Sequence, residues 1–124
     1  MRSDKYPLFF VLLFISHFIF HSSHLYGEWL GAAGKVEITP DLSRPVYLAG
    51  YGSKGRRALA VRDPLYARGV VLSDGRQKVV FVAFDLIGLF RPYVQKIRED
   101  FPGVYVLAAS IHTHSGPDTL GLWG

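Results

Sequence analysis

Two histidines near the end of the sequence have the spacing of a metal-binding pair. His112 and His114 follow residues 104–110, an apolar run with the composition of a buried strand. If the strand continues through them, their side chains point to the same side, about 7 Å apart along the strand. Imidazole nitrogens are common zinc ligands, so the pair predicts a divalent-metal site or a ligand site. The alternative is a polar strand end whose histidines are solvated or hydrogen-bonded.

Four further residues are candidates for the same site. Asp85 ends another apolar run, where it can supply a carboxylate ligand or instead cap a turn or pair with an arginine. Gly116 removes side-chain bulk beside the imidazoles. Ser115 is expected at the rim of the site, and the sequence identifies neither the base nor the oxyanion hole that a nucleophile needs. Asp118 is either a further oxygen ligand or a turn former.

The elements that must position these residues follow from the apolar patterning. It predicts strands over residues 35–39, 66–72, 78–86 and 104–110, and a helix over residues 91–101 in which Val94, Ile97 and Phe101 face the sheet. Residues 42–62, rich in glycine and without periodicity, are expected to form a loop. Ser73-Asp-Gly75 supplies turn chemistry for a hairpin. The fold class is α/β (or α+β): a mixed sheet with a hairpin followed by a strand–helix–strand unit, an incomplete part of a larger domain.

The strand–helix–strand order predicts where the site lies. Such a unit normally joins two parallel strands, and both runs are apolar on both faces, as in a sheet covered on two sides. Ligand sites in open α/β sheets lie beyond the carboxyl ends of strands. Asp85, His112 and His114 are therefore expected at one rim if the two strands are neighbours.

Composition limits the function classes. The 124 residues carry a formal charge of +4, with lysines and arginines scattered, which argues against a nucleic-acid partner; no protein partner can be inferred. The chain has no cysteine, which excludes disulfides and cysteine-based zinc sites. Any metal must then bind histidine, carboxylate or tyrosine.

The first 27 residues have the character of an export signal. Arg2 and Lys5 precede an apolar run over residues 8–20, which is short for a membrane-spanning helix and suits the core of a signal peptide. No Ala-x-Ala cleavage site is present, so an uncleaved N-terminal anchor remains the alternative. Residues 1–27 are expected to be a signal peptide or anchor, and the protein to be exported: periplasmic, secreted or membrane-anchored.

Four blocks resemble the neutral/alkaline (non-lysosomal) ceramidase family, at the start of its N-terminal catalytic domain. In order, they are Gly34-Lys-Val-Glu-Ile-Thr-Pro40, Ala49-Gly-Tyr-Gly52, Asp63-Pro-Leu-Tyr-Ala-Arg68 and Ile111-His-Thr-His-Ser-Gly-Pro117. The resemblance covers residues 31–124, and the histidine block is its most specific part. Residues 28–124 are accordingly expected to be the N-terminal portion of a ceramidase-like domain.

The resemblance implies a Zn²⁺-dependent amidase that cleaves ceramide, or a similar N-acyl lipid, into sphingosine and a fatty acid, with a membrane surface as a further partner. It implies that His112 binds zinc, with His114 a neighbour or alternate ligand. The family's serine nucleophile lies in a Gly-Asp-x-Ser-Pro block that is absent here, and its remaining ligands come later in the chain. The sequence is therefore expected to be a fragment that is inactive alone. The alternative is a non-catalytic exported α/β domain that binds a metal or lipid.

Overall fold

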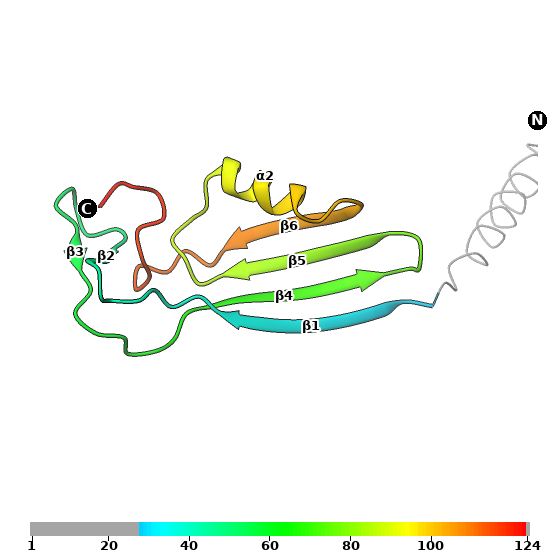
Figure 1. Cartoon of the computed structure of the whole chain (residues 1–124), viewed down its shortest axis with the longest axis horizontal. Coiled ribbons are helices and arrows are strands. Elements are labelled where there is room, and N and C mark those ends of the chain that lie inside the picture. The colour runs from blue at the N-terminus through cyan, green and yellow to red at the C-terminus, as the bar shows by residue number, and fades with distance from the viewer. Residues whose placement is uncertain (1–27, 124) are drawn as a thin grey trace, which may run out of the picture.

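The computed structural model describes residues 28–123, so the predicted signal peptide or anchor lies outside the described residues. A four-stranded sheet in the order β1-β4-β5-β6 forms the body of the molecule (Figure 1). Its strands are β1 (Leu30–Glu37), β4 (Tyr66–Ser73), β5 (Lys78–Phe84) and β6 (Val104–Ser110). Strand β4 is antiparallel to both β1 and β5, whereas β5 and β6 are parallel. This mixed sheet confirms the predicted fold class.

The β4–β5 hairpin is built by its turn residues. The backbone N–H groups of Arg76 and Gln77 donate to Oδ1 of Asp74, at 2.9 and 2.7 Å. Gly75 has φ +84°, a conformation that glycine adopts without steric cost. Ser73 then pairs with Lys78, which fixes the register of the hairpin. The predicted turn at Ser73-Asp-Gly75 is therefore confirmed.

Helix α2 (Arg91–Glu99) connects β5 to β6 and lies over β6 (Figure 1). Pro92 stands in its first turn, where a missing N–H costs no hydrogen bond. Val94 and Ile97 are its half-buried positions. The helix is two residues shorter than predicted, and Phe101, expected to face the sheet, lies beyond its end with 55 % of its surface exposed. Among the described residues, no helix is long and apolar enough to cross a membrane.

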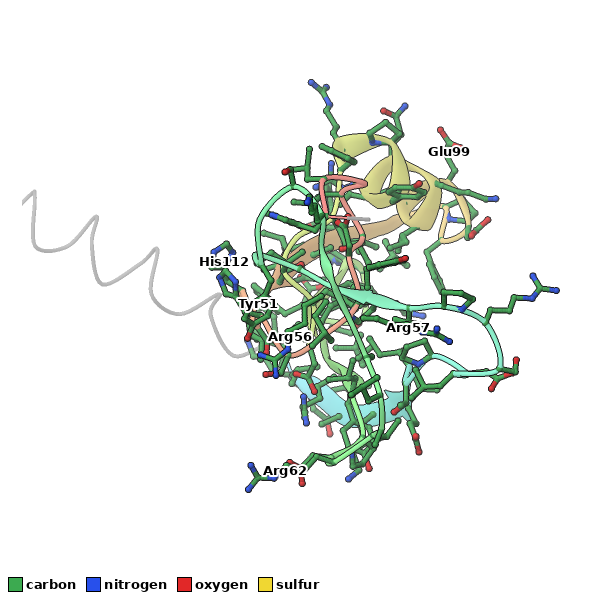
Figure 2. All side chains as sticks on the ribbon, turned by 90° about the vertical axis from the view of Figure 1, so that its left-hand side faces the viewer. Tyr51, Arg56, Arg57, Arg62, Glu99 and His112 are labelled. Carbon is green, nitrogen blue, oxygen red and sulfur yellow. The ribbon has the colours of Figure 1, made fainter. Side chains whose placement is uncertain are left out.

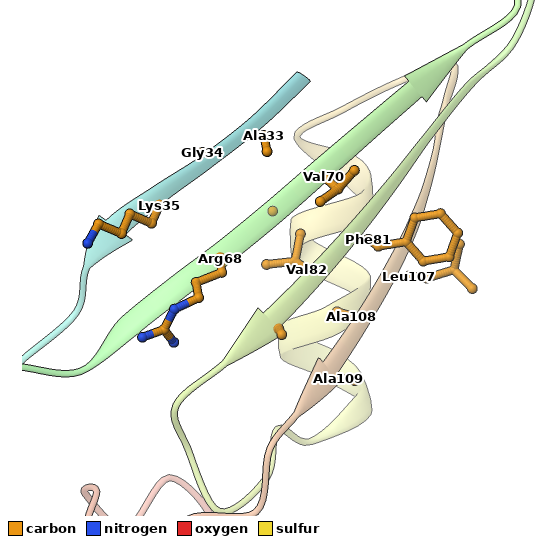
Figure 3. A pocket seen from close by; sticks show the side chains of 12 residues that line it. Ala33, Gly34, Lys35, Arg68, Val70, Phe81, Val82, Leu107, Ala108 and Ala109 are labelled. Atoms are coloured by element: carbon orange, nitrogen blue, oxygen red, sulfur yellow. The ribbon is translucent and has the colours of Figure 1, made fainter. Parts of the chain in front are cut away.

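The other face of the sheet differs from the prediction that helices cover both sides. Val70, Phe81 and Leu107 lie next to one another across three strands and are each close to half exposed. Figure 3 shows these side chains on the side of the sheet away from α2. The described residues thus include helix cover for one face only.

Several boundaries correct the predictions. Strand β1 begins five residues earlier than expected and ends at Glu37. Beyond it, the N–H of Ile38 donates to the carbonyl of Leu65, and Oγ1 of Thr39 accepts from the N–H of Leu65. Strand β4 extends one residue further, and β5 ends at Phe84, so Asp85 stands just beyond the ladder. The expected loop over residues 42–62 contains a small ribbon of β2 (Tyr47–Leu48) and β3 (Arg56–Arg57). Strand β6 has the predicted bounds.

The most buried apolar side chains gather mainly near the carboxyl end of β5. Leu86 and Ile87 follow the strand, Ala67 lies on β4 opposite Phe84, and Ala49 belongs to the loop after β2. Packing is therefore densest where the chain leaves the sheet and reaches the two histidines. This end of the sheet holds the candidate site.

Candidate metal centre

The segment after β6 is held along the residues that follow β5. The N–H of Ile111 donates to the carbonyl of Phe84 at 3.0 Å, and the N–H groups of His112 and Thr113 donate to the carbonyl of Leu86 at 3.0 and 3.2 Å. The two chain segments therefore remain side by side beyond the strand ends, as expected for neighbouring parallel strands.

The two imidazoles come together, but by a different route from the one the sequence suggested. The strand ends at Ser110, and His112 has φ +64°, a left-handed conformation uncommon for a residue with a side chain. Strand alternation therefore does not apply to the pair. The rings of His112 and His114 nevertheless lie with centroids 5.2 Å apart, at 86° to each other, and both residues are exposed.

His112 is oriented by a backbone carbonyl. Its Nδ1 lies 2.9 Å from the carbonyl oxygen of Ile87, which can only accept a hydrogen bond. In neutral His112, Nδ1 must therefore carry the proton, which leaves the lone pair on Nε2. Metal-binding histidines are commonly fixed in this way, with one ring nitrogen donating to a carbonyl and the other facing the ion.

His114 is held by the loop that follows β2. Gly50 has φ +87°, and a Cβ atom at that position would overlap the imidazole of His114. Tyr51 packs its ring edge-to-face with His114, at a centroid distance of 6.4 Å. This loop is attached to the histidine segment by the N–H of Ala49, which donates to the carbonyl of Gly116 at 3.2 Å. Ala49-Gly-Tyr-Gly52 and the histidine block, far apart in sequence, therefore form one unit.

Asp85 is not brought together with the histidines. One guanidinium nitrogen of Arg68 lies 2.6 Å from both carboxylate oxygens, and the N–H of Tyr66 donates to Oδ2 at 2.8 Å. These groups reach Asp85 because β4 runs beside β5, with Arg68 opposite Ala83. The carboxylate thus makes the arginine pair that the sequence left open as the alternative to a metal ligand.

The remaining candidates also have defined positions. Ser115 is exposed, and its N–H donates to Oγ1 of Thr113 at 3.2 Å. Gly116 is buried, but the space that it leaves lies against the backbone of Asp85 rather than the imidazoles. The carboxylate of Asp118 accepts four backbone N–H groups between Leu120 and Trp123, which makes it a turn former.

Both candidate aspartates, Asp85 and Asp118, have pKa values below their ordinary range. For Asp85, the hydrogen bond from Arg68 is the largest influence and lowers the pKa, against an opposing effect of burial. For Asp118, burial raises the pKa, but the four backbone N–H groups together outweigh it and lower the pKa. Both carboxylates are therefore ionised at neutral pH and already hydrogen-bonded.

The donor set fits part of a zinc site. Two exposed imidazoles, one of them with Nδ1 fixed by a carbonyl, offer nitrogen ligands of the right kind. A catalytic zinc usually takes three protein ligands, and residues 28–123 contain no group of three or more histidine, cysteine, aspartate or glutamate side chains. The described residues thus offer two donors, and a complete set needs at least one more.

Sequence reasoning did not assign Gly50, Tyr51 or Ile87 to this site. Ile87 acts through its backbone, which residue type does not reveal. Gly50 and Tyr51 stand in a glycine-rich stretch, and the pattern Gly50-Tyr-Gly52 was the available signal, since alternating glycines allow the positive φ angles found there.

Comparisons with known proteins give the following similarities. No protein-family model matches the chain. A curated relative, neutral ceramidase from Pseudomonas aeruginosa, is 30 % identical in an alignment of 94 residues that covers 68 % of this chain and 14 % of the relative. The chain therefore spans about one seventh of the length of that relative.

Solved structures agree with this match. The crystal structure of neutral ceramidase from Pseudomonas aeruginosa superimposes with a TM-score of 0.59 and 28 % identity, over 72 % of this chain and 16 % of that one. A structure of a ceramidase complexed with C2 gives a TM-score of 0.60 and 28 % identity, over 72 % of this chain and 15 % of that one.

Proposed function

The similarities in sequence and structure support the neutral ceramidase family for the matched part of this chain. From this premise we propose that the chain supplies His112, and His114 as a second ligand or a neighbour, to the zinc site of a hydrolase. This hydrolase cleaves the amide bond of a ceramide-like N-acyl lipid. The observation that carries the proposal is the pair of exposed imidazoles, with centroids 5.2 Å apart, in the segment after β6.

His112 is the primary ligand in this proposal. Donation of its Nδ1–H to the carbonyl of Ile87 keeps the ring in one tautomer and directs the Nε2 lone pair away from the backbone. His114, seated between Gly50 and Tyr51, serves as the second donor or as a neighbour that hydrogen-bonds the ligands. When bound, zinc lowers the pKa of a coordinated water and polarises the scissile carbonyl.

Three residues near the histidines, Asp85, Asp118 and Ser115, have supporting roles. The carboxylate of Asp85 is neutralised by Arg68, so it stabilises the sheet end on which the histidine segment rests. Asp118 organises the turn after that segment. Ser115 lies at the rim, and among the described residues it has no hydrogen-bonded base that would make it a nucleophile.

Zinc binding to the full chain in detergent tests the proposal. Titration calorimetry is expected to give one zinc per chain for the wild type, and loss of binding for His112→Ala. The matched control is His24→Ala, which removes a histidine outside the described residues and is expected to retain binding. No zinc binding by the wild type, or equal binding by all three proteins, would contradict the proposal.

Hydrolysis of a short-chain N-acylsphingosine is measured in the same preparations with added zinc. Release of fatty acid that is lost in His112→Ala supports the amidase and contradicts the non-catalytic domain. Zinc binding without any release is expected both of a non-catalytic metal-binding domain and of a fragment that lacks the serine nucleophile, so it contradicts only an amidase that is active in this chain alone.

Export is part of the proposal and rests on the sequence of residues 1–27. A basic start followed by a short apolar run is typical of a signal peptide. N-terminal sequencing of the expressed protein from the medium or periplasm is expected to give a start near residue 28. Recovery of the full-length chain from the membrane fraction supports an anchor, and recovery from the cytosol contradicts export.

A further inference from the structure

An exposed apolar tip between arginines projects from the ribbon of β2 and β3. We call residues 56–62 the arginine-flanked loop. Leu59 has 90 % of its surface exposed and Val61 has 50 %. Arg56 and Arg57 precede the tip and Arg62 follows it. The side chain of Arg62 is 96 % exposed, and its contact with Asp63 is long, at 3.6 Å, so this guanidinium is available to a partner.

The base of this loop is fixed. Arg56 and Arg57 pair with Leu48 and Tyr47 across the ribbon, and the N–H of Ala58 donates to the carbonyl of Val46 at 2.8 Å. Leu59 is therefore presented by an anchored base. Exposing a leucine this fully costs favourable burial, which a partner surface would recover.

The loop is continuous with the two imidazoles. The guanidinium of Arg56 lies 5.3 Å from the ring of Tyr51, and that ring is edge-to-face with His114. In Figure 2, Tyr51, Arg56 and His112 lie near one another on one side of the view, while Arg57 lies on the other side and Arg62 below them. A molecule that binds the loop would therefore lie next to the candidate metal centre.

A cavity separates the loop from the histidine segment. Its volume is about 710 Å³, and its apolar lining includes Leu42, Leu59, Leu65 and Ile111. The charged lining residues are four arginines and two aspartates: Arg56, Arg57, Arg62, Arg68, Asp63 and Asp85. With arginines in excess, the cavity suits a molecule with an anionic or polar head and a hydrocarbon chain. No aromatic residue lines it, so it offers a polynucleotide no stacking platform.

We propose that the arginine-flanked loop docks on an anionic lipid surface, with Leu59 entering the interface and Arg56, Arg57 and Arg62 at the lipid phosphates. The choice of a lipid partner rests in part on the proposed function. The physical argument is charge complementarity. Arginines placed around an exposed apolar side chain attract anionic lipids electrostatically, and the apolar side chain is buried in the interface.

The absence of cysteine from the chain allows a site-specific test. In the full-length protein, Leu59→Cys carries an environment-sensitive fluorophore at the tip. Arg76→Cys carries it at the β4–β5 turn, at the opposite end of the sheet (Figure 1). Each is mixed, in buffer with EDTA, with vesicles of phosphatidylcholine alone or of phosphatidylcholine with phosphatidylserine. Residues 1–27 join the sheet at Leu30, which pairs with Ser73 beside the β4–β5 turn. Membrane attachment through them would therefore bring the Arg76→Cys probe closer to the bilayer, and it does not account for a response at Leu59→Cys.

The expected result is a blue shift and a several-fold rise in emission at Leu59→Cys with anionic vesicles only, reversed by high salt, and no difference between the two vesicle types at Arg76→Cys. Adding Arg56→Gln and Arg57→Gln to the Leu59→Cys protein is expected to weaken the response roughly tenfold in apparent affinity. Circular dichroism of the labelled proteins shows whether each is folded.

Three outcomes would overturn the proposal: equal responses with neutral and anionic vesicles, a response at Arg76→Cys but not at Leu59→Cys, or a response to an oligonucleotide and not to vesicles. Because EDTA removes zinc, the vesicle experiment does not depend on zinc binding. A response to vesicles can be found without zinc binding, and zinc binding can be found without a response to vesicles. The two proposals are therefore tested separately.

Discussion

The imidazole of His114 lies so close to Gly50 that this position has no room for a side chain. Its backbone has φ +87°, and a Cβ atom there would overlap the ring. The position of the second histidine thus depends on a glycine more than sixty residues away in sequence, in the loop after β2.

Replacing this glycine is expected to move the imidazole. Gly50→Ala must shift either the loop or the ring of His114, so zinc affinity is expected to fall about tenfold, as for other groups that orient metal ligands. Isothermal titration with zinc measures this effect.

The matched control for this variant is Gly52→Ala. Gly52 also has positive φ, at +75°, but no atom lies within 4 Å of an added Cβ. Both variants are expected to lose about 1 kcal/mol of unfolding free energy through backbone strain. If zinc affinity falls equally in both, strain rather than contact with His114 is responsible.

The backbone at His112 predicts an unusual order of stabilities. At φ +64°, a residue with a Cβ atom is strained and glycine is not. Although both substitutions remove the imidazole, His112→Gly is expected to be about 1 kcal/mol more stable to urea than His112→Ala. An alanine variant as stable as the glycine variant would show that the left-handed conformation is absent in solution.

The pair of Arg68 and Asp85 is expected to stabilise the site end of the sheet. Asp85 is buried, and its carboxylate accepts from both Arg68 and the N–H of Tyr66. Asp85→Asn removes the charge and is expected to cost about 2 kcal/mol of unfolding free energy, because a charged, partly buried hydrogen bond is lost.

The surface pair of Arg62 and Asp63 provides the comparison. Their side chains are 96 % and 82 % exposed, with 3.6 Å between the charged atoms. Asp63→Asn is therefore expected to change unfolding free energy by less than about 0.5 kcal/mol. Similar losses from Asp63→Asn and Asp85→Asn in urea titrations would contradict the special role of the buried carboxylate.

The sheet was predictable because its information is local. Continuous apolar runs predicted β5 and β6, and Ser73-Asp-Gly75 predicted the hairpin turn. The details of the site could not be predicted from the sequence, because they depend on contacts between distant segments. No local pattern predicts the left-handed backbone of His112, the carbonyl of Ile87 beside its ring, or Gly50 against His114. The reach of Arg68 to Asp85 likewise requires knowing that β4 lies next to β5.

The lowered pKa values of Asp85 and Asp118 predict loss of stability in acid. In the unfolded chain these carboxyls titrate near their ordinary pKa, about 3.9. In the native state they hold their protons less tightly, so below that pH the unfolded state binds more protons. Their contribution is complete above about pH 5 and is lost as pH falls through the lower native pKa values.

Urea unfolding across this pH range tests the prediction. Wild-type unfolding free energy is expected to fall steadily from about pH 5 downward. Asp118→Asn cannot ionise at residue 118, so it is expected to start lower at pH 7 and to fall less steeply in acid. The four N–H groups that donate to Asp118 belong to residues 120–123. The difference in pH dependence between the wild type and Asp118→Asn should therefore be greatest in probes of this turn, such as Trp123 fluorescence. Parallel pH profiles for the two proteins would mean that Asp118 is not the ionised acceptor of this turn.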